Sequence, residues 1–349
     1  MGINKIKDLK NIIIIRLSSL GDIVMTSPVF EVLKKNYPES KITFISSKQF
    51  SGLMEANPHI DSIIYADLKD EHKDKNGLLR FIKDNNLQDS EFDLLIDLHF
   101  NLRSRFLSSK IKSKRKVHWS SDSLKRRLYV AFHIPFNIHP VTYRYLETIA
   151  KFIGEKDFSG FSYTHYADSD IMERILSNYP QLKDAILVLP GSQWFTKMYP
   201  KKYFIDLLKM FQNEQIYILG GPEEKELCDE IASEINSKSF ASHFSLSELN
   251  SVISVAKAVI TNDSGPMHIS VGLGVPTIAF FGSTTRGLGF MPDHEDSLVI
   301  EDEKLSCRPC SLHGRVICPK KHFKCMNNLK PEVVFSKIQD WINARNSKR

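Results

Sequence analysis

The first half of the chain alternates between short apolar runs and longer stretches in which apolar residues recur at helical spacing. Runs rich in β-branched residues predict buried strands, and the helical spacing predicts helices that cover them. The predicted strands are residues 11–17, 41–46, 62–65 and 92–98. The predicted helices are residues 23–36, 50–56 and 76–85. This alternation is typical of a parallel sheet in an α/β domain.

A second series of the same kind follows a helix predicted at residues 143–153. Residues 154–169 are polar and rich in Gly, Ser and Asp, and they predict the junction between two domains. The strands of the second series are predicted at residues 185–189, 215–219, 258–261 and 277–281. Its helices are predicted at residues 200–211, 223–235, 246–256 and 265–272. The chain has 349 residues, about twice the length of a typical domain, so we expect two α/β domains at residues 1–165 and 166–349.

The composition is that of an ordinary globular protein, with 42% apolar and 25% charged residues. No apolar run approaches the roughly 18 to 20 residues that span a bilayer. The N-terminal segment carries lysines but lacks an apolar stretch followed by a small-residue cleavage site. We therefore expect a soluble, cytoplasmic protein.

The net charge is +6, and the positive charge is concentrated in one segment. Residues 103–127 contain ten Lys or Arg residues and a single acid, Asp122. Such a cluster attracts a polyanion, namely nucleic acid, an anionic membrane surface or a phosphorylated substrate, or else it is only a solvated face. Guanidinium groups suit bidentate phosphate contacts. The arginines that favour a phosphate partner are Arg103, Arg105, Arg126 and Arg127.

Polar loops follow several predicted strands, at the edge where open α/β sheets bind ligands. The loop at residues 16–22 ends in Asp22, at the start of the following helix. Asp22 is either an N-cap residue or a carboxylate that acts as a general base. The loop at residues 189–197 contains Ser192 and Lys197, which could hold phosphate oxygens, although the spacing of a P-loop is absent.

A third polar loop, residues 261–268, leads into a helix opened by Gly265 and Pro266. The N–H groups and the positive dipole end of such a helix would face a bound diphosphate. His268 in this helix is either a ligand-binding residue or a histidine buried in the helix packing.

Taken together, these loops and their order resemble the lipopolysaccharide heptosyltransferases of glycosyltransferase family 9. The resemblance covers roughly residues 11–340, and the C-terminal segment that begins with Cys307 is most similar to the heptosyltransferase II branch. The segments that carry it are residues 14–22, residues 97–104, Pro190-Gly191-Ser192 with Lys197, residues 220–224 and residues 262–268.

The resemblance implies a GT-B fold, in which two Rossmann-like domains face a cleft and the C-terminal domain holds the donor. The last helix of the chain could then pack back on the N-terminal domain. The family moves L-glycero-D-manno-heptose from ADP-heptose to the inner core of lipopolysaccharide or lipooligosaccharide in Gram-negative bacteria. It inverts the anomeric centre without a metal or cofactor. By resemblance Asp22 is the general base, and Lys197 stabilises the leaving diphosphate.

The resemblance also assigns residues to the two substrates. Glu224 would contact the adenosine ribose and Asp263 the heptose hydroxyls. The complete expected donor set is Ser192, Lys197, Glu224, Asp263, Ser264, Gly265, Pro266, Met267 and His268. The expected acceptor set is Ser19, Arg103, Arg105, Arg126 and Arg127. The acceptor would be a lipid A core that carries Kdo or heptose, reached by transient contact with the inner leaflet of the inner membrane, with no nucleic acid partner.

Four of the five cysteines follow the pattern C-x2-C-x7-C-x6-C near the C-terminus. The first pair has the spacing of a zinc knuckle but the last pair does not, so a structural metal, reduced thiols and disulfides all stay open. These residues are Cys307, Cys310, Cys318 and Cys325. Cys228 falls on a predicted helix and is expected in the core.

Two other functions remain compatible with these patterns. A zinc-containing nucleic-acid-binding protein would use the basic segment and the cysteines, although no known nucleic-acid motif is present. A transferase of the same fold could use another nucleotide sugar or a protein acceptor. The sequence leaves the acceptor sugar and the oligomeric state open.

Overall fold

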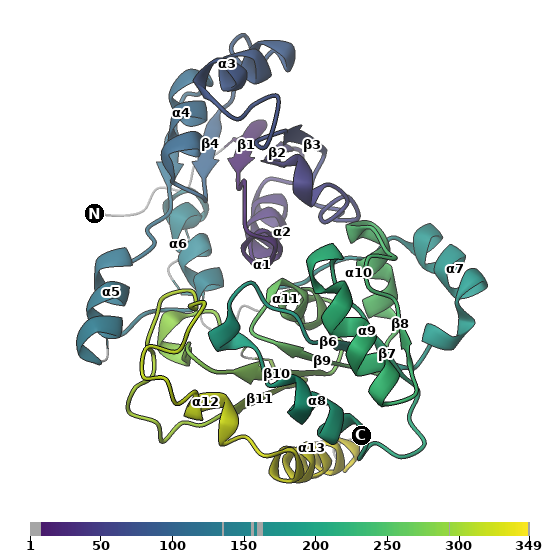
Figure 1. Ribbon diagram of the computed structural model, residues 1–349. Coiled ribbons are helices and arrows are strands. Elements are labelled where there is room, and N and C mark those ends of the chain that lie inside the picture. The colour runs from purple at the N-terminus through teal and green to yellow at the C-terminus, as the bar shows by residue number, and fades with distance from the viewer. Residues whose placement is uncertain (1–7, 135, 155–156, 159–162, 293, 348–349) are drawn as a thin grey trace. The chain divides into compact units, whose positions relative to one another are not determined.

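The computed structural model describes residues 8–134, 136–154, 157–158, 163–292 and 294–347 (Figure 1). The chain forms two compact units, of which the first comprises Met1–Ser121 and Val141–Tyr166. The second comprises Asp122–Pro140 and Ala167–Arg349. Part of the predicted junction, residues 155–156 and 159–162, lies outside the described residues.

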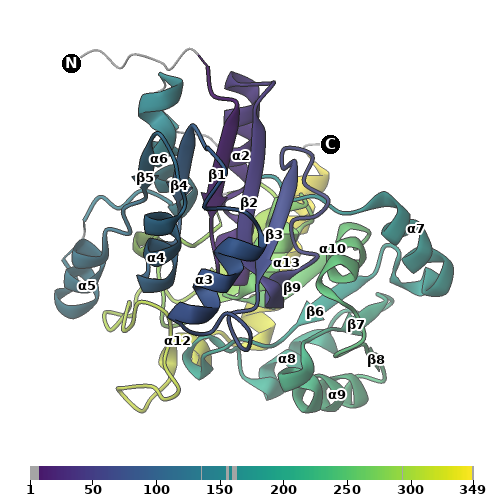
Figure 2. The ribbon, with the colours of Figure 1, turned by 90° about the horizontal axis from the view of Figure 1, so that it is seen from above.

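A five-stranded parallel sheet in the order β3-β2-β1-β4-β5 forms the first unit (Figure 2). Its strands are β1 (Asn11–Ile15), β2 (Lys41–Ser47), β3 (Ser62–Ala66), β4 (Leu94–Asp97) and β5 (Lys116–His118). The central strand β1 pairs with β2 and β4, and its side chains from Ile12 to Ile15 are fully buried. Burial on both faces explains the unbroken β-branched run in the sequence.

Five α-helices belong to the described part of the first unit. They are α1 (Leu20–Val24), α2 (Ser27–Asn36), α3 (Lys75–Asp84), α4 (Leu102–Lys110) and α6 (Val141–Ile153). The single helix expected at residues 23–36 is wrong: Pro28 occupies the first turn of α2, where its missing N–H needs no partner, and the chain turns before it. The helix expected at residues 50–56 is also wrong, because this segment forms turns in which Gly52 has a φ of 83°.

The second unit has a six-stranded parallel sheet in the order β11-β10-β9-β6-β7-β8. Its strands are β6 (Ile186–Leu189), β7 (Ile216–Ile218), β8 (Lys238–Ser239), β9 (Ala258–Asn262), β10 (Thr277–Phe281) and β11 (Ser297–Glu301). The two edge strands β8 and β11 were absent from the sequence prediction. They are only partly buried, so they lack the apolar runs of the central strands.

One helix of the second unit, α5 (Ser123–Phe132), is separated from the others in the sequence by residues 141–166 of the first unit. The others are α7 (Ser169–Asn178), α8 (Lys201–Leu208), α9 (Lys225–Glu234), α10 (Leu246–Ser254), α11 (Gly265–Gly272), α12 (Lys324–Asn327) and α13 (Pro331–Asn346). Residues 122–140, which we expected in the N-terminal domain, group with the second unit because Tyr129 on α5 is hydrogen-bonded to Thr285. The last helix, α13, packs on α8 and β11 of its own unit.

Strand order reverses once in each sheet. In the first unit the chain runs from β1 outward to β2 and β3 and then places β4 on the other side of β1. In the second unit β7 and β8 lie on one side of β6, and β9 to β11 lie on the other. Both orders are Rossmann-like, as the expected α/β fold with two such domains requires. Ligands bind such sheets where the order reverses, between the loops after the two adjoining strands.

None of the helices in the described ranges is both long enough and apolar enough to cross a bilayer.

Candidate functional site

The loop after β1 contains the predicted general base. Ser19 is the N-cap of α1, and Asp22 is the third residue of this helix, so the expectation that Asp22 is itself the N-cap is wrong. The Ser19 hydroxyl donates a 2.7 Å hydrogen bond to Asp22 Oδ2, as in a capping box. The Asp22 carboxylate is thereby fixed at the first turn of the helix.

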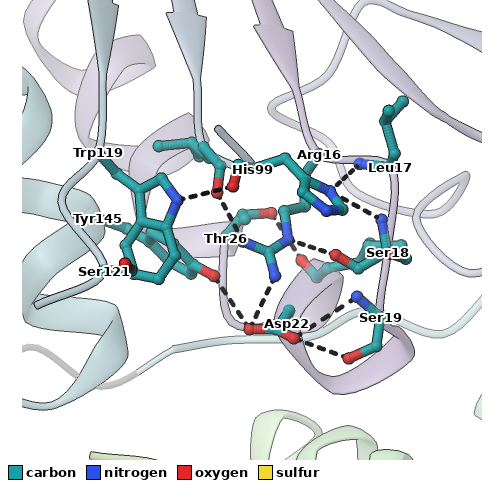
Figure 3. Close-up of polar contacts among 12 residues, drawn as sticks. Arg16, Leu17, Ser18, Ser19, Asp22, Thr26, His99, Trp119, Ser121 and Tyr145 are labelled. Atoms are coloured by element: carbon teal, nitrogen blue, oxygen red, sulfur yellow. Dashed lines mark hydrogen bonds and ion pairs between the residues drawn. The ribbon is translucent and has the colours of Figure 1, made fainter. Parts of the chain in front are cut away.

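A buried arginine at the end of β1 joins the two loops where the strand order reverses (Figure 3). Arg16 Nη2 lies 2.9 Å from Asp22 Oδ1. The same guanidinium donates to the carbonyl oxygens of Ser18 and Leu98, both at 2.6 Å. Leu98 directly follows β4, so this side chain connects the β1 loop to the β4 loop.

Two aromatic rings lie on the other side of the Arg16 guanidinium (Figure 3). The rings of Trp119 and Tyr145 each lie 5.6 Å from the guanidinium carbon, a cation–π distance. Tyr145 donates a 3.2 Å hydrogen bond to Asp22 Oδ1. Burial raises the pKa of Tyr145, so its hydroxyl keeps the proton that it donates.

His99 supports the same loop from the end of β4. Its Nδ1 accepts hydrogen bonds from the backbone N–H groups of Leu17 and Ser18, at 3.1 and 3.3 Å. Burial and the positive charge of Arg16 lower the pKa of His99 to about 3. The ring is therefore neutral near pH 7, and Nδ1 acts as an acceptor that holds the loop.

Asp97, the last residue of β4, organises the turn that follows. Its Oδ1 accepts from the N–H groups of His99 and Phe100, and its Oδ2 accepts from the Ser104 hydroxyl at 2.8 Å. Asp97 is buried, and burial raises the pKa of its carboxyl. This network explains why the 97–104 segment forms a distinct motif in the sequence.

In the second unit, Asn262 at the end of β9 connects the two loops at the reversal point. Its side chain donates to the carbonyl oxygen of Pro190 at 2.7 Å and accepts from the N–H of Tyr199 at 2.9 Å. Both partners belong to the loop after β6. The buried amide thus holds the 190–199 segment against the start of the 263–268 segment.

The two predicted phosphate and sugar contacts in these loops are paired with each other. Lys197 Nζ lies 2.8 Å from Asp263 Oδ2, which also accepts a 2.5 Å hydrogen bond from the Thr284 hydroxyl. The side chain of Asp263 is only 5% exposed and that of Lys197 is 15% exposed. The buried carboxylate therefore holds the more accessible ammonium in position. Ser192 donates to the Asp263 carbonyl oxygen at 3.4 Å.

Helix α11 begins at the same edge of the sheet. Ser264 is its N-cap, Gly265 is its first residue and Pro266 its second. The N–H groups in the first turn of a helix lack partners within the helix, and the helix dipole is positive there. Met267 and His268 are buried within the unit. Because of these free N–H groups and the dipole, the start of α11 can stabilise an anion through its backbone.

Glu224 lies against the loop after β6. Its Oε2 accepts a 2.8 Å hydrogen bond from the N–H of Gly221. A Cβ atom added to Gly191 would fall 1.7 Å from Glu224 Oε1, so only glycine lets the carboxylate approach this loop. The structure thus brings the predicted ribose contact next to the Pro190-Gly191-Ser192 motif.

The C-terminal cysteine segment supports the donor loops. The buried Arg308 donates to the carbonyl oxygens of Gly282 and Thr284, at 2.5 and 2.8 Å. Arg315 exchanges backbone contacts with Thr196: its N–H donates to the Thr196 hydroxyl, and its carbonyl oxygen accepts from the Thr196 N–H. This segment therefore positions both Thr284 and the turn that carries Lys197.

All five cysteines are free thiols in the structure. Cys228 is buried in the core, as expected. Cys307 Sγ lies 4.0 Å from His322 Nε2, and burial raises the pKa of Cys325 to about 12 and also that of Cys310. Within the described ranges, no group of three or more His, Cys, Asp or Glu side chains is placed to hold a metal ion.

The predicted acceptor arginines are divided between the two units. Arg103 and Arg105 are exposed on α4, and Arg105 lies 5.1 Å from the ring of Phe100. Arg126 is buried on α5 and Arg127 is exposed there, both in the second unit. Arg126 and Arg127 thus belong to the second unit, although residues 1–165 were expected to form one N-terminal domain, and their role toward an acceptor stays a prediction.

Several residues of the site were not assigned a role from the sequence. Arg16 carried a signal, since a charged residue directly ends a fully apolar strand. Tyr145 lies on a predicted helix more than 100 residues away, and neither it nor Thr284 belongs to a recognisable local motif. Asn262 belongs to a quoted motif, but its structural role follows only from the contacts.

Comparison with known proteins identifies the family of the chain. Residues 80–315 match the family model of glycosyltransferase family 9 (heptosyltransferase). The lipooligosaccharide heptosyltransferase 2 of Campylobacter jejuni is 28% identical over 340 residues, which cover 93% of this chain and 95% of the relative. The lipopolysaccharide heptosyltransferase 1 of Campylobacter coli is 30% identical over 296 residues, covering 78% and 84%.

Solved structures share the fold. A family 9 glycosyltransferase from Veillonella parvula has a TM-score of 0.81 and 23% identity, with 98% of this chain and 100% of that chain covered. The ADP-heptose heptosyltransferase II of E. coli has a TM-score of 0.73 and 16% identity, covering 96% and 99%. The two parallel sheets with their helices match these GT-B-like structures.

The fold is that of a two-domain, GT-B-like glycosyltransferase. The chain belongs to glycosyltransferase family 9, the heptosyltransferases of lipopolysaccharide core biosynthesis. This family membership favours a glycosyltransferase over the alternative of a zinc-containing nucleic-acid-binding protein.

The shifted pKa of His99 predicts how the stability of the first unit depends on pH. Below about pH 6.5 an unfolded histidine binds a proton, whereas the native ring stays neutral down to about pH 3. The free energy of unfolding should therefore fall by about 1 kcal/mol between about pH 7 and pH 5, allowing for partial solvent access to the ring. Urea denaturation followed by circular dichroism measures this change.

The variant His99→Gln should reduce this loss of stability, because it removes the titrating ring. The exposed His118 of the same unit provides the matched control, and His118→Gln should leave the pH dependence of the wild type unchanged. Equal pH dependence in His99→Gln and the wild type would contradict the assignment.

Proposed function

We propose that the protein transfers L-glycero-D-manno-heptose from ADP-heptose to the inner core of lipopolysaccharide or lipooligosaccharide, with inversion at the anomeric carbon. Its family membership supports heptosyl transfer in core biosynthesis. The solved structures of a related E. coli heptosyltransferase, WaaC, contain ADP and ADP-2-deoxy-2-fluoro heptose. Those ligands support an ADP-linked heptose as the donor of this protein.

The observation that carries the proposal is the pairing of unlike charges at the two reversal points. At the first point the buried Arg16 holds the Asp22 carboxylate, and at the second the buried Asp263 holds the Lys197 ammonium. A carboxylate can accept a proton from an attacking hydroxyl, and an ammonium can stabilise a departing diphosphate. Both groups are needed for glycosyl transfer by a single displacement.

Acceptor activation is assigned to the first unit. In the proposed reaction Asp22 removes the proton of the acceptor hydroxyl while its oxygen bonds to the anomeric carbon. The bond from that carbon to the diphosphate oxygen breaks in the same displacement, which inverts the configuration. Arg16, Tyr145 and Ser19 orient the carboxylate through the contacts described above. Arg103 and Arg105 on α4 remain candidates for contacts to acidic acceptor sugars.

Donor binding is assigned to the second unit. Lys197, the Ser192 hydroxyl and the N–H groups at the start of α11 would hold the diphosphate, whose negative charge increases as the bond to heptose breaks. This cationic and backbone environment supports a transfer that proceeds without a metal or cofactor. Glu224, beside Gly191, is the candidate contact to the ribose.

The acceptor is a glycolipid in this proposal, which places its reactive sugar close to a bilayer. We infer that the enzyme works at the cytoplasmic face of the inner membrane, by transient contact with the inner leaflet. Exposed cations next to apolar side chains in the second unit support such contact, as described in the next subsection.

The substitution Asp22→Asn tests the general base. It keeps the size of the side chain but removes its basicity, so kcat should fall at least about 100-fold. ADP affinity should stay near that of the wild type, because the donor contacts are assigned to the second unit. The loss of the Arg16 partner should also lower the free energy of unfolding by about 1–3 kcal/mol. Steady-state kinetics, ADP calorimetry and urea denaturation measure the three quantities.

The matched control for this variant is Tyr145→Phe. It removes one contact to Asp22 but keeps the carboxylate, so kcat should fall less than about tenfold. Normal turnover by a folded Asp22→Asn protein would show that the base lies elsewhere.

The substitution Lys197→Ala tests diphosphate binding. In buffer that contains EDTA, calorimetry should show ADP binding by the wild type and a Kd about 10- to 100-fold higher for the variant, the equivalent of one charge-assisted contact of about 1.5–3 kcal/mol. Lys201→Ala is the control, because Lys201 lies close to Lys197 in the sequence but forms an exposed ion pair with Glu230 of α9. Strict dependence of ADP binding on magnesium, or an unchanged Kd for Lys197→Ala, would count against this assignment.

A double variant separates two causes of weaker binding. Removal of Lys197 also leaves Asp263 with an uncompensated charge that repels a diphosphate. In Lys197→Ala/Asp263→Asn that repulsion is absent. ADP binding that remains weak in the double variant supports direct contact by Lys197, and restored binding contradicts it.

The substitution Gly191→Ala tests the place of Glu224. The new methyl group would overlap the carboxylate, which is the flexible end of its side chain, so Glu224 should move while the fold persists. The Kd for ADP should rise about threefold to tenfold, as for the loss of one hydrogen bond. Gly221→Ala is the control, since its Cβ would lie an ordinary 3.9 Å from Glu224. Equal ADP affinity in the two variants would remove Glu224 from the binding site.

A further inference from the structure

Exposed apolar side chains are concentrated in two segments of the second unit. Among the described residues ten large apolar side chains are exposed, and five of them lie on α5 or just after it and in the C-terminal cysteine segment. The exposed fractions reach 70% for Leu124, 65% for Phe132 and 72% for Ile317. Large apolar groups that are grouped in this way usually mark an interaction surface.

The two segments are joined through contacts within the second unit. His133, which ends α5, lies with its Nδ1 3.1 Å from the carbonyl oxygen of Arg308. On the inner face of α5, Tyr129 is hydrogen-bonded to Thr285 and Arg126 lies 5.1 Å from the ring of Phe290. The outer face of α5 is therefore fixed in its orientation by packing on the opposite side.

The apolar tip of the cysteine segment is also held in place. The Arg315 N–H donates to the Thr196 hydroxyl, the Arg315 carbonyl oxygen accepts from the Thr196 N–H, and Arg315 Nε donates to the Cys310 carbonyl oxygen at 3.2 Å. Val316 and Ile317 follow directly and are exposed. A fixed backbone that presents two adjacent apolar side chains to solvent needs a reason other than core packing.

Positive charge lies along the same two segments. Arg315, Lys320 and Lys321 are exposed close to Val316 and Ile317 in the sequence, whereas Arg308 is buried and paired with Glu301. Residues 304–330 contain seven Lys or Arg residues and no acid. On α5, Lys125 pairs with Asp122 at 3.3 Å, and Arg127 is exposed beside it. We call the combined set the basic-apolar surface. Its members are Leu124, Lys125, Arg127, Phe132, Ile134, Arg315, Val316, Ile317, Lys320 and Lys321.

We propose that the basic-apolar surface docks the second unit on a bilayer that contains anionic phospholipids. Apolar side chains enter the headgroup and acyl boundary, and the surrounding cations attract the anionic headgroups. A nucleic acid would use the cations but not the exposed Phe, Ile and Leu side chains. A second copy of the chain would bring like charges together in an isologous contact. The proposal rests on the proposed function, since the acceptor is a glycolipid.

Vesicle binding tests the surface without donor or acceptor. The full-length protein is sedimented with phosphatidylethanolamine vesicles that contain phosphatidylglycerol, and in parallel with pure phosphatidylcholine vesicles. Binding to the anionic vesicles alone is expected. Absence of binding to them, or equal binding to both kinds, would overturn the proposal, as would retention on heparin without any vesicle binding.

Two sets of variants assign the binding to the surface. Leu124→Ser/Phe132→Ser should lower the partition into anionic vesicles at least about tenfold, and Lys320→Glu/Lys321→Glu should do the same. The control is Val333→Ser/Lys337→Glu on α13, which changes an exposed apolar residue and an exposed cation elsewhere in the unit. Wild-type vesicle binding by the surface variants, or an equal loss in the control, would overturn the proposal.

The two hypotheses fail in different measurements. ADP calorimetry on each surface variant should give the wild-type Kd, which shows that the unit is folded, and transfer to a delipidated core oligosaccharide should be retained. Loss of ADP binding together with vesicle binding would attribute the effect to the fold of the unit and overturn the docking assignment. Vesicle binding by a wild-type protein that transfers no heptose would refute the proposed function but leave the docking surface in place.

Discussion

The reversal of strand order in each sheet is the constraint on which both halves of the site depend. The chain builds one side of the central strand first and then crosses to the other side, so the loops after β1 and β4, and after β6 and β9, become neighbours. Connecting helices leave such a point in opposite directions and do not cover it. Polar groups that are 82 residues apart in the sequence, such as the Arg16 guanidinium and the Leu98 carbonyl, therefore meet at one edge.

At each of these points a buried charged side chain forms an ion pair with a more accessible side chain of opposite charge, and the signs are exchanged between the two units. In the first unit a buried cation, Arg16, holds the partly accessible carboxylate of Asp22. In the second unit a buried anion, Asp263, holds the partly accessible ammonium of Lys197. A buried charge without a partner costs several kcal/mol, so each buried member fixes the position of its exposed partner. A carboxylate and an ammonium are thus presented with little freedom to reorient.

The C-terminal cysteine segment connects the donor loops to the outer surface of the second unit. Arg308 donates hydrogen bonds to the carbonyl oxygens of Gly282 and Thr284, in the loop that follows β10. The N–H of Arg315 donates to the hydroxyl of Thr196, the residue before Lys197. Val316 and Ile317 of this segment face solvent, and His133 at the end of α5 lies 3.1 Å from the Arg308 carbonyl oxygen of the same segment. One segment therefore supports donor binding on its inner side and offers apolar and cationic groups on its outer side.

The central strands and most of the helices beside them could be predicted from the sequence, because burial on both faces of a sheet requires apolar, β-branched runs. The loops that carry Asp22, Lys197 and Asp263 could also be predicted, because parallel strands place the loops after them at one edge of the sheet. The sequence analysis missed β5, α4 and α5, where frequent lysines and arginines hide a sparse apolar pattern, and it assigned residues 122–140 to the N-terminal domain although they belong to the second unit. The hydrogen bond from Tyr145 to Asp22 and the shared contact of Thr284 and Lys197 with Asp263 could be learned only from the folded chain. Such contacts join residues far apart in the chain, and a local pattern records burial and periodicity but not the partner across the fold.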